Sequence, residues 1–182
     1  MKKFLAVTCV AMIATTAFAA ELTPGLKVGQ RVPAFHVQDV TGPAKDRGKI
    51  CYRCQYGNRP VVSIFAREMT PEVAKLVKEI DGVVGKNQDK KMAAFVVLMT
   101  EDPDTAESGL KKVATEQKIQ HTPLTVFDGK AGPRGYKVAK DADVTIMMWN
   151  ESKVAAAHGF KKDKFNKDAI SKVVKATKKI LN

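Results

Sequence analysis

Apolar residues recur along this chain with two different periods, and their alternation predicts an α/β fold. Short, near-continuous apolar runs are typical of buried strands, whereas apolar residues three and four positions apart are typical of helices that bury one face. The predicted strands cover residues 34–40, 50–55, 60–66, 92–99, 124–127, 144–149 and 154–158, and the predicted helices cover 70–85, 110–119 and 170–181. Strands that alternate with helices favour a parallel sheet with right-handed crossovers, and the last two strands add an antiparallel edge.

The first predicted helix has the clearest boundaries. Thr70 is a favoured N-cap residue, and Pro71 suits the first helical position because its missing N–H would have no partner there. Gly85 is expected to end the helix. We therefore interpret the Thr70 hydroxyl as a cap rather than as a nucleophile.

The first 19 residues have the pattern of a secretory signal peptide. Lys2 and Lys3 precede an uncharged, mostly apolar stretch, and Ala17-Phe18-Ala19 forms a small-x-small cleavage site. The apolar stretch is shorter than the roughly 20 residues that span a bilayer. We predict an exported protein, periplasmic or extracellular, that comprises a signal peptide over 1–19 and a single domain over 20–182, with no transmembrane segment after the signal is removed.

Composition and charge narrow the class of partner. The chain has 182 residues, 45% of them hydrophobic, which suits one globular domain. Lys and Arg total 31 against 19 Asp and Glu, which gives a net charge of +12. In an exported protein this charge favours weak binding to anionic surfaces, and we expect no nucleic-acid partner and no cofactor.

Several motifs, taken in order, resemble those of thioredoxin-fold proteins of the peroxiredoxin-like and thiol-disulfide oxidoreductase branch. Residues 28–35 read Val-Gly-Gln-Arg-Val-Pro-Ala-Phe, similar to the Gly-x-x-x-Pro-x-Phe opening of that family. The similarity continues through 60–66, 124–129, 136–138 and 145–159. The resemblance implies a thioredoxin-like sandwich, with a central mixed sheet, flanking helices and an N-terminal β-hairpin extension.

The chain departs from that family at its usual active site. The family's reactive cysteine follows the central strand, at the N-terminus of the first helix, where helix N–H groups stabilise a thiolate. Residues 67–72 read Arg-Glu-Met-Thr-Pro-Glu and contain no cysteine. The family's cis-proline also has no counterpart in Asp141-Ala142-Asp143-Val144. We therefore expect no thiol peroxidase activity.

Cys51 and Cys54 are the candidate catalytic residues. Cys9 would leave with the signal peptide, and two cysteines in an oxidising compartment most simply form one disulfide. Arg53 and other nearby basic residues would favour a thiolate, so we expect thiol-disulfide exchange with protein thiols or disulfides. The alternative is a non-catalytic thioredoxin-fold binding module in which the disulfide is structural.

Metal and haem sites find little support in the sequence. A zinc site needs about four ligands, and there is no second Cys-x-x-Cys motif. Covalent haem attachment needs a histidine after the second cysteine, where this chain has Gln55. His36, His121 and His158 are scattered, and we interpret each as a structural residue.

Overall fold

The computed structural model describes residue 22 and residues 24–181. The predicted signal peptide, residues 1–19, lies outside the described residues and stays a prediction. Among the described residues, no helix combines the length and the apolar character needed to cross a membrane.

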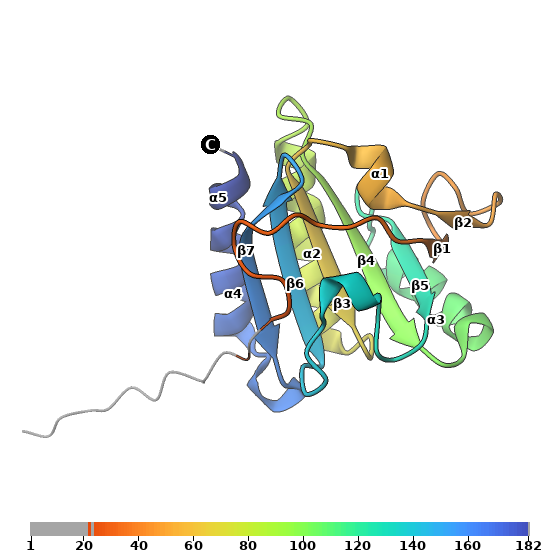
Figure 1. Cartoon of the computed structure of the whole chain (residues 1–182). Coiled ribbons are helices and arrows are strands. Elements are labelled where there is room, and N and C mark those ends of the chain that lie inside the picture. Colours follow the sequence, from red (N-terminus) through yellow and green to blue (C-terminus); the bar gives the residue numbers. More distant parts are fainter. Residues whose placement is uncertain (1–21, 23, 182) are drawn as a thin grey trace, which may run out of the picture.

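A seven-stranded mixed sheet forms the centre of the molecule, in the strand order β2-β1-β5-β4-β3-β6-β7 (Figure 1). The strands are β1 (Val37–Asp39), β2 (Lys49–Ile50), β3 (Val61–Ala66), β4 (Ala93–Thr100), β5 (Leu124–Asp128), β6 (Val144–Asn150) and β7 (Lys153–Phe160). Strand β3 is parallel to β4 and antiparallel to β6, and β4 is parallel to β5. The prediction of a parallel centre with a late antiparallel edge is confirmed.

The helices divide unequally between the two faces of this sheet. They are α1 (Tyr52–Tyr56), α2 (Pro71–Lys86), α3 (Pro103–Glu116), α4 (Lys167–Ala176) and α5 (Lys178–Leu181), with short 3-10 turns η1 (Arg134–Tyr136) and η2 (Lys162–Lys164). Helices α2, α3 and α4 bury their apolar stripes on one face, where they form a first core with alternate residues of the strands. Two right-handed crossovers from β3 to β4 to β5 place α2 and α3 on the same side.

The opposite face is covered by α1, by η1 and by the N-terminal segment, residues 24–36 (Figure 1). Together they bury a second core that is rich in aromatic rings, including Tyr52, Phe95, Tyr136 and Trp149. The N-terminal segment is also tied to the last strand. The Gly29 N–H donates to the Val154 carbonyl at 2.7 Å, and the Val154 N–H donates to the Gln30 carbonyl at 2.9 Å.

The N-terminal boundary of α2 is confirmed, and its C-terminal boundary is corrected. The Thr70 hydroxyl accepts the Val73 N–H at 3.3 Å, as a helix cap does. The helix continues past Gly85 to Lys86. Gly85 has another use: a Cβ there would lie 3.0 Å from the His121 ring. The glycine therefore gives that ring room to approach the helix.

The prediction of a strand over residues 50–55 is wrong beyond Ile50. The chain turns there into the five-residue helix α1. Tyr52 and Tyr56 lie one helical turn apart, and both of their rings pack on Phe95 of β4. Apolar Ile50 and Tyr52 two positions apart resemble strand alternation, but the position of Tyr56 fits the helical period instead.

Candidate functional site

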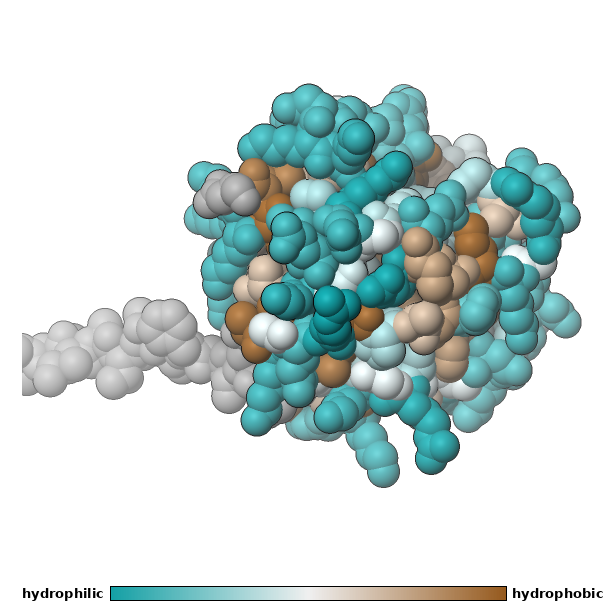
Figure 2. Space-filling view, turned by 45° about the horizontal axis from the view of Figure 1, so that its top comes forward, coloured by the Kyte–Doolittle hydropathy of each residue, from teal (hydrophilic) through white to brown (hydrophobic). Residues whose placement is uncertain are grey.

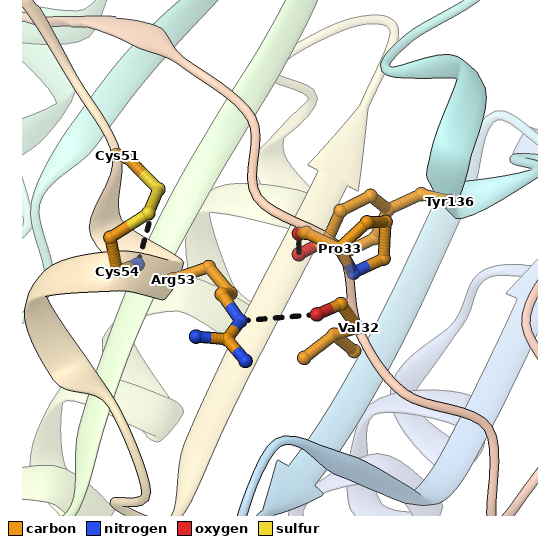
Figure 3. The surroundings of a disulfide bond; sticks show 6 residues. All are labelled: Val32, Pro33, Cys51, Arg53, Cys54 and Tyr136. Carbon is orange, nitrogen blue, oxygen red and sulfur yellow. Dashed lines mark hydrogen bonds between the residues drawn. A yellow bond between two sulfur atoms is a disulfide. The ribbon is translucent and has the colours of Figure 1, made fainter.

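Cys51 and Cys54 form a disulfide at the start of α1, with their Cα atoms 5.2 Å apart (Figure 3). Cys51 is the N-cap of α1 and is half-buried, whereas Cys54 is exposed. The backbone N–H of Cys54 donates to Cys51 Sγ at 3.1 Å. The two sulfurs are therefore unlike: one belongs to an exposed residue, and the other already accepts a hydrogen bond of the kind that stabilises a thiolate.

Tyr52 anchors α1 to the sheet independently of the disulfide. Its side chain is 1% exposed, and its hydroxyl donates to Asp39 Oδ2 at 2.7 Å. The Asp39 carboxylate also accepts the N–H groups of Gly42 and Ala44. Burial raises the pKa of Tyr52 far above its ordinary value, and the hydrogen bond to Asp39 raises it further. Tyr52 therefore stays neutral, and it positions the cysteine that precedes it in the chain.

Arg53, between the two cysteines, holds the N-terminal segment. Its Nε donates to the Val32 carbonyl at 3.0 Å, and the Tyr136 hydroxyl donates to the next carbonyl, that of Pro33, also at 3.0 Å. Figure 3 shows the Arg53 side chain directed toward Val32 and away from the disulfide. Arg53 was expected from the sequence to stabilise a thiolate, whereas in the structure its hydrogen bond goes to the N-terminal segment.

A second arginine, Arg67, lies between β3 and α2, in the stretch where the sequence contains no cysteine. Arg67 directly follows β3, and its guanidinium donates to the carbonyls of Ala142 at 2.9 Å, Ala139 at 3.1 Å and Lys130. Its backbone N–H donates to the Asp143 carbonyl at 3.0 Å. This end of β3 is therefore bonded to two loop segments, one between β5 and η1 and one between η1 and β6, and the cavity beside it measures only about 110 Å³.

The three histidines are not brought together. His36 and His121 are exposed, ahead of β1 and β5 respectively, and His158 is buried on β7. Within the described part of the chain, no group of three or more His, Cys, Asp or Glu residues is placed to hold a metal ion. Asp39, which accepts the Tyr52 hydroxyl, was not identified from the sequence, and the helical spacing of Tyr52 and Tyr56 was the available signal for α1.

Comparison with known proteins supports the fold but does not assign an activity. No protein-family model matches the chain, and no curated protein sequence matches it significantly. Among solved structures, a protein provisionally assigned as a disulfide isomerase from Bacteroides thetaiotaomicron has a TM-score of 0.63 and 14% identity, over 88% of this chain and 94% of its own. A Chlorobium tepidum protein provisionally assigned as the thiol:disulfide interchange protein DsbE has a TM-score of 0.59 and 16% identity, over 84% and 99%.

A peroxiredoxin is equally similar. AhpC from Mycobacterium tuberculosis has a TM-score of 0.60 and 13% identity, over 85% of this chain and 99% of its own. Both branches named by the sequence motifs therefore appear among the structural neighbours. Identities this low carry a fold and not an activity. The chain has the thioredoxin-like fold, with a Cys-x-x-Cys disulfide capping a short helix ahead of the central strand.

Proposed function

We propose that this protein is exported and exchanges disulfides with protein thiols through Cys51 and Cys54. The observation that carries the proposal is the asymmetry of the two sulfurs: Cys54 is exposed, while Cys51 Sγ accepts an N–H from within the same motif. The two structural neighbours provisionally assigned to disulfide isomerisation and interchange support it. The charged, apolar and small-residue pattern of residues 1–19 supports export to a compartment where such chemistry operates.

The exchange consists of two balanced displacements. A partner thiolate attacks the Sγ of Cys54, which is an exposed residue, the Cys51–Cys54 bond breaks, and Cys51 leaves as a thiolate that keeps its hydrogen bond from the Cys54 N–H. A second thiolate of the partner then attacks the partner sulfur of the mixed disulfide, and Cys54 leaves. The partner is oxidised by two electrons and the protein is reduced by two; the reverse sequence reduces a partner disulfide.

The disulfide is expected to contribute little to the stability of α1. In the chain-entropy description, a ring this small stabilises the folded protein by only about 2 kcal/mol, because it removes little entropy from the unfolded chain. The Tyr52–Asp39 and Arg53–Val32 hydrogen bonds already hold α1 and its surroundings. A disulfide that adds little to a segment already anchored is better explained by its chemistry.

Partner recognition is expected to be electrostatic. The end of the molecule that carries α1 turns forward from Figure 1 to Figure 2, and hydrophilic side chains cover most of that face. Val28 is the large hydrophobic side chain that stands out as exposed among the described residues, at 67%. The full chain has a net charge of +12, and loss of Lys2 and Lys3 with the signal peptide would leave +10, which would attract acidic partner proteins more than apolar ones.

The reduction potential of the pair tests the proposal. The protein is equilibrated in glutathione or dithiothreitol buffers of known potential, and free thiols are counted by alkylation and mass. We expect a value between about −270 and −120 mV, where exchange-active pairs lie, with the folded state verified by the fluorescence of the buried Trp149. A value below about −300 mV, or reduction only on unfolding, would instead support the binding module with a structural disulfide.

A further inference from the structure

We propose that a lysine-lined groove between α3 and α1 binds an extended, acidic segment of the partner protein and so brings the partner's cysteine to the disulfide. This inference names the substrate surface for the exchange proposed above, on which it rests. Two hollows make up the groove, one of about 510 Å³ beside α3 and one of about 480 Å³ beside α1. Thr41, Ile119 and Gln120 line both hollows, so the two adjoin.

The groove leads toward the helix that carries the disulfide. Residues between 40 and 45, after β1, and residues between 111 and 120, in the second half of α3 and beyond it, line the larger hollow. The other hollow extends along residues 119–123 to Tyr56, the last residue of α1. Because a helix rises only about 1.5 Å per residue, Cys54 lies within one turn of Tyr56. Figure 1 shows α1, β1, β5 and α3 together on one side of the molecule.

The charges that line the groove are of one sign. Lys45, Lys111 and Lys118 line the larger hollow, and among the described residues that line either hollow none is Asp or Glu. Lys111 pairs with Glu107 at 3.2 Å, whereas Lys45 and Lys118 form no ion pair with any other described residue. Lys78 of α2 adds a further cation, since its Nζ donates to the Lys118 carbonyl at 3.1 Å.

The carboxylate that lies close behind the groove already has its partners. Asp81 of α2 is 4% exposed, and its carboxylate accepts the N–H of Gln120 at 3.1 Å and the N–H of His121 at 2.7 Å. These bonds hold the turn that lines both hollows, so the groove is formed before any partner binds. They also leave the lysine ammonium groups of the groove without Asp81 as an ion-pair partner.

Two other hollows of the molecule carry both signs of charge. At the end of β3, Lys162 and Glu68 line the same cavity and form an ion pair at 2.7 Å. A hollow of about 200 Å³ beside β1 is lined by both Lys49 and Asp128. In those places the chain supplies its own counter-charge. In the groove it does not, so the complementary charge has to come from a partner.

The groove also offers an apolar floor and an unused polar group. Buried Val40 and half-buried Ala114 and Ile119 lie among its lining residues. Successive side chains of an extended segment point to opposite sides, so one set can meet this floor while the other meets the lysines. Thr122, in the hollow beside α1, is 2% exposed, and its hydroxyl has no hydrogen-bond partner among the described residues. A peptide group of the bound segment would supply that missing bond.

Binding of a peptide without a thiol tests the groove by itself. The probe is a fluorescently labelled peptide in which glutamate and valine alternate, followed by a serine, and its affinity is measured by anisotropy at low salt. Lys45→Gln with Lys118→Gln should weaken binding by about fivefold, because two exposed contacts to carboxylates are lost. Added salt should narrow this difference, since exposed charges are screened.

A matched pair of substitutions separates the groove from the overall charge. Lys175→Gln with Lys179→Gln removes the same charge from exposed positions of α4 and α5 and should change the affinity by less than about twofold. A peptide with glutamine in place of glutamate should bind the unaltered protein more weakly and should not distinguish the variants. Equal losses in the two lysine pairs, or equal affinities for the two peptides, would overturn the inference.

Exchange rates connect the groove to the disulfide. With cysteine in place of the serine, the acidic peptide should reduce the Cys51–Cys54 bond about fivefold more slowly in the groove variant than in the matched control. The small uncharged thiol 2-mercaptoethanol should reduce all the proteins at the same rate. A slower reaction of the groove variant with both thiols would mean that its disulfide itself had changed, and would overturn the docking role.

Failure of this inference and failure of the proposed exchange give different results. The peptide without a thiol reports binding whether or not the disulfide is active, and the reduction potential is measured on the unaltered protein without a peptide. A potential outside the range of exchange-active pairs would reject the exchange. A potential inside that range, together with peptide binding that is insensitive to Lys45 and Lys118, would overturn the docking groove alone.

Discussion

Two helix starts in this molecule use the same local device, and only one of them carries sulfur. At the end of β3, Thr70 caps α2 with a hydroxyl that accepts the Val73 N–H. At the end of β2, Cys51 caps α1 with a sulfur that accepts the Cys54 N–H. Thr70 is buried, whereas the disulfide partner of Cys51 is exposed. A thioredoxin-like fold can therefore place a sulfur at the N-cap of α1, while the N-cap of α2 is a hydroxyl that is buried.

The neighbouring arginines extend the same contrast. Arg67, beside the Thr70 cap, binds three loop carbonyls, whereas Arg53, beside the Cys51 cap, binds one. The first region is therefore built as a junction of loops, and the second as a short helix on an aromatic core. Each difference predicts a distinct effect of mutation.

The largest effect is expected at the sulfur cap. Cys54→Ser should lower the rate of thiol-disulfide exchange with glutathione by more than about 100-fold, because the attacked sulfur is gone. Thr70→Ala should leave that rate unchanged and cost about 1 kcal/mol of stability, the usual loss on removing an N-cap. Exchange is followed by mass spectrometry of glutathione adducts. If Cys54→Ser kept the full exchange rate, the exchange would not depend on the disulfide at the start of α1.

A smaller effect, on stability alone, is expected from the two arginines. Arg67→Met should lower the free energy of unfolding by about 2–3 kcal/mol, because several carbonyls lose a charged donor at once. Arg53→Met should cost about 1 kcal/mol for its single carbonyl. Methionine keeps much of the apolar stem in both variants, and urea unfolding measures the two changes side by side. Equal losses would show that the junction at Arg67 is no stronger than the contact at Arg53.

The smallest effect is the loss of stability at high pH that we expect from Tyr52 of α1. The pKa of Tyr52 is raised by burial and by Asp39, so its folded form keeps its proton where the unfolded chain, with a tyrosine pKa near 10, loses it. Its stabilisation is therefore present below pH 10 and is lost as the pH rises above it, by about 1.4 kcal/mol at pH 11.

Tyr52→Phe serves as the control for that pH effect. The variant should be less stable at pH 8, where its hydrogen bond to Asp39 is missing, yet should lose less stability between pH 8 and pH 11. Urea midpoints at both pH values give the comparison. Equal losses of stability in the two proteins between pH 8 and pH 11 would mean that ionisation of Tyr52 is not their cause.

Local signals in the sequence were enough for most of the sheet and for α2. The runs at 60–66 and 92–99 are almost entirely apolar, with Ser63 the exception, because β3 and β4 are buried on both faces. Thr70 and Pro71 mark a helix start by themselves. The Cys-x-x-Cys motif was likewise visible without a structure. These features depend on neighbours in the chain, which a single sequence contains.

The parts that were missed depend on contacts between distant residues. Nothing near Tyr52 in the chain indicates that Asp39, 13 positions earlier, accepts its hydroxyl. Gly85 reads as a helix end until the His121 ring is seen against it. The hydrogen bond from Arg53 to the Val32 carbonyl, 21 positions earlier, is visible only in the folded chain.

The bonds between the N-terminal segment and β7 have a consequence for the order of folding. Residues 29 and 30 bond to Val154, more than 120 positions later, so the cover over the aromatic core closes only when nearly the whole chain is available. Such long loop closures are slow, whereas the cysteines are three residues apart and meet early. The disulfide can therefore form in an open intermediate, before the segment held by Arg53 seals the face beside it.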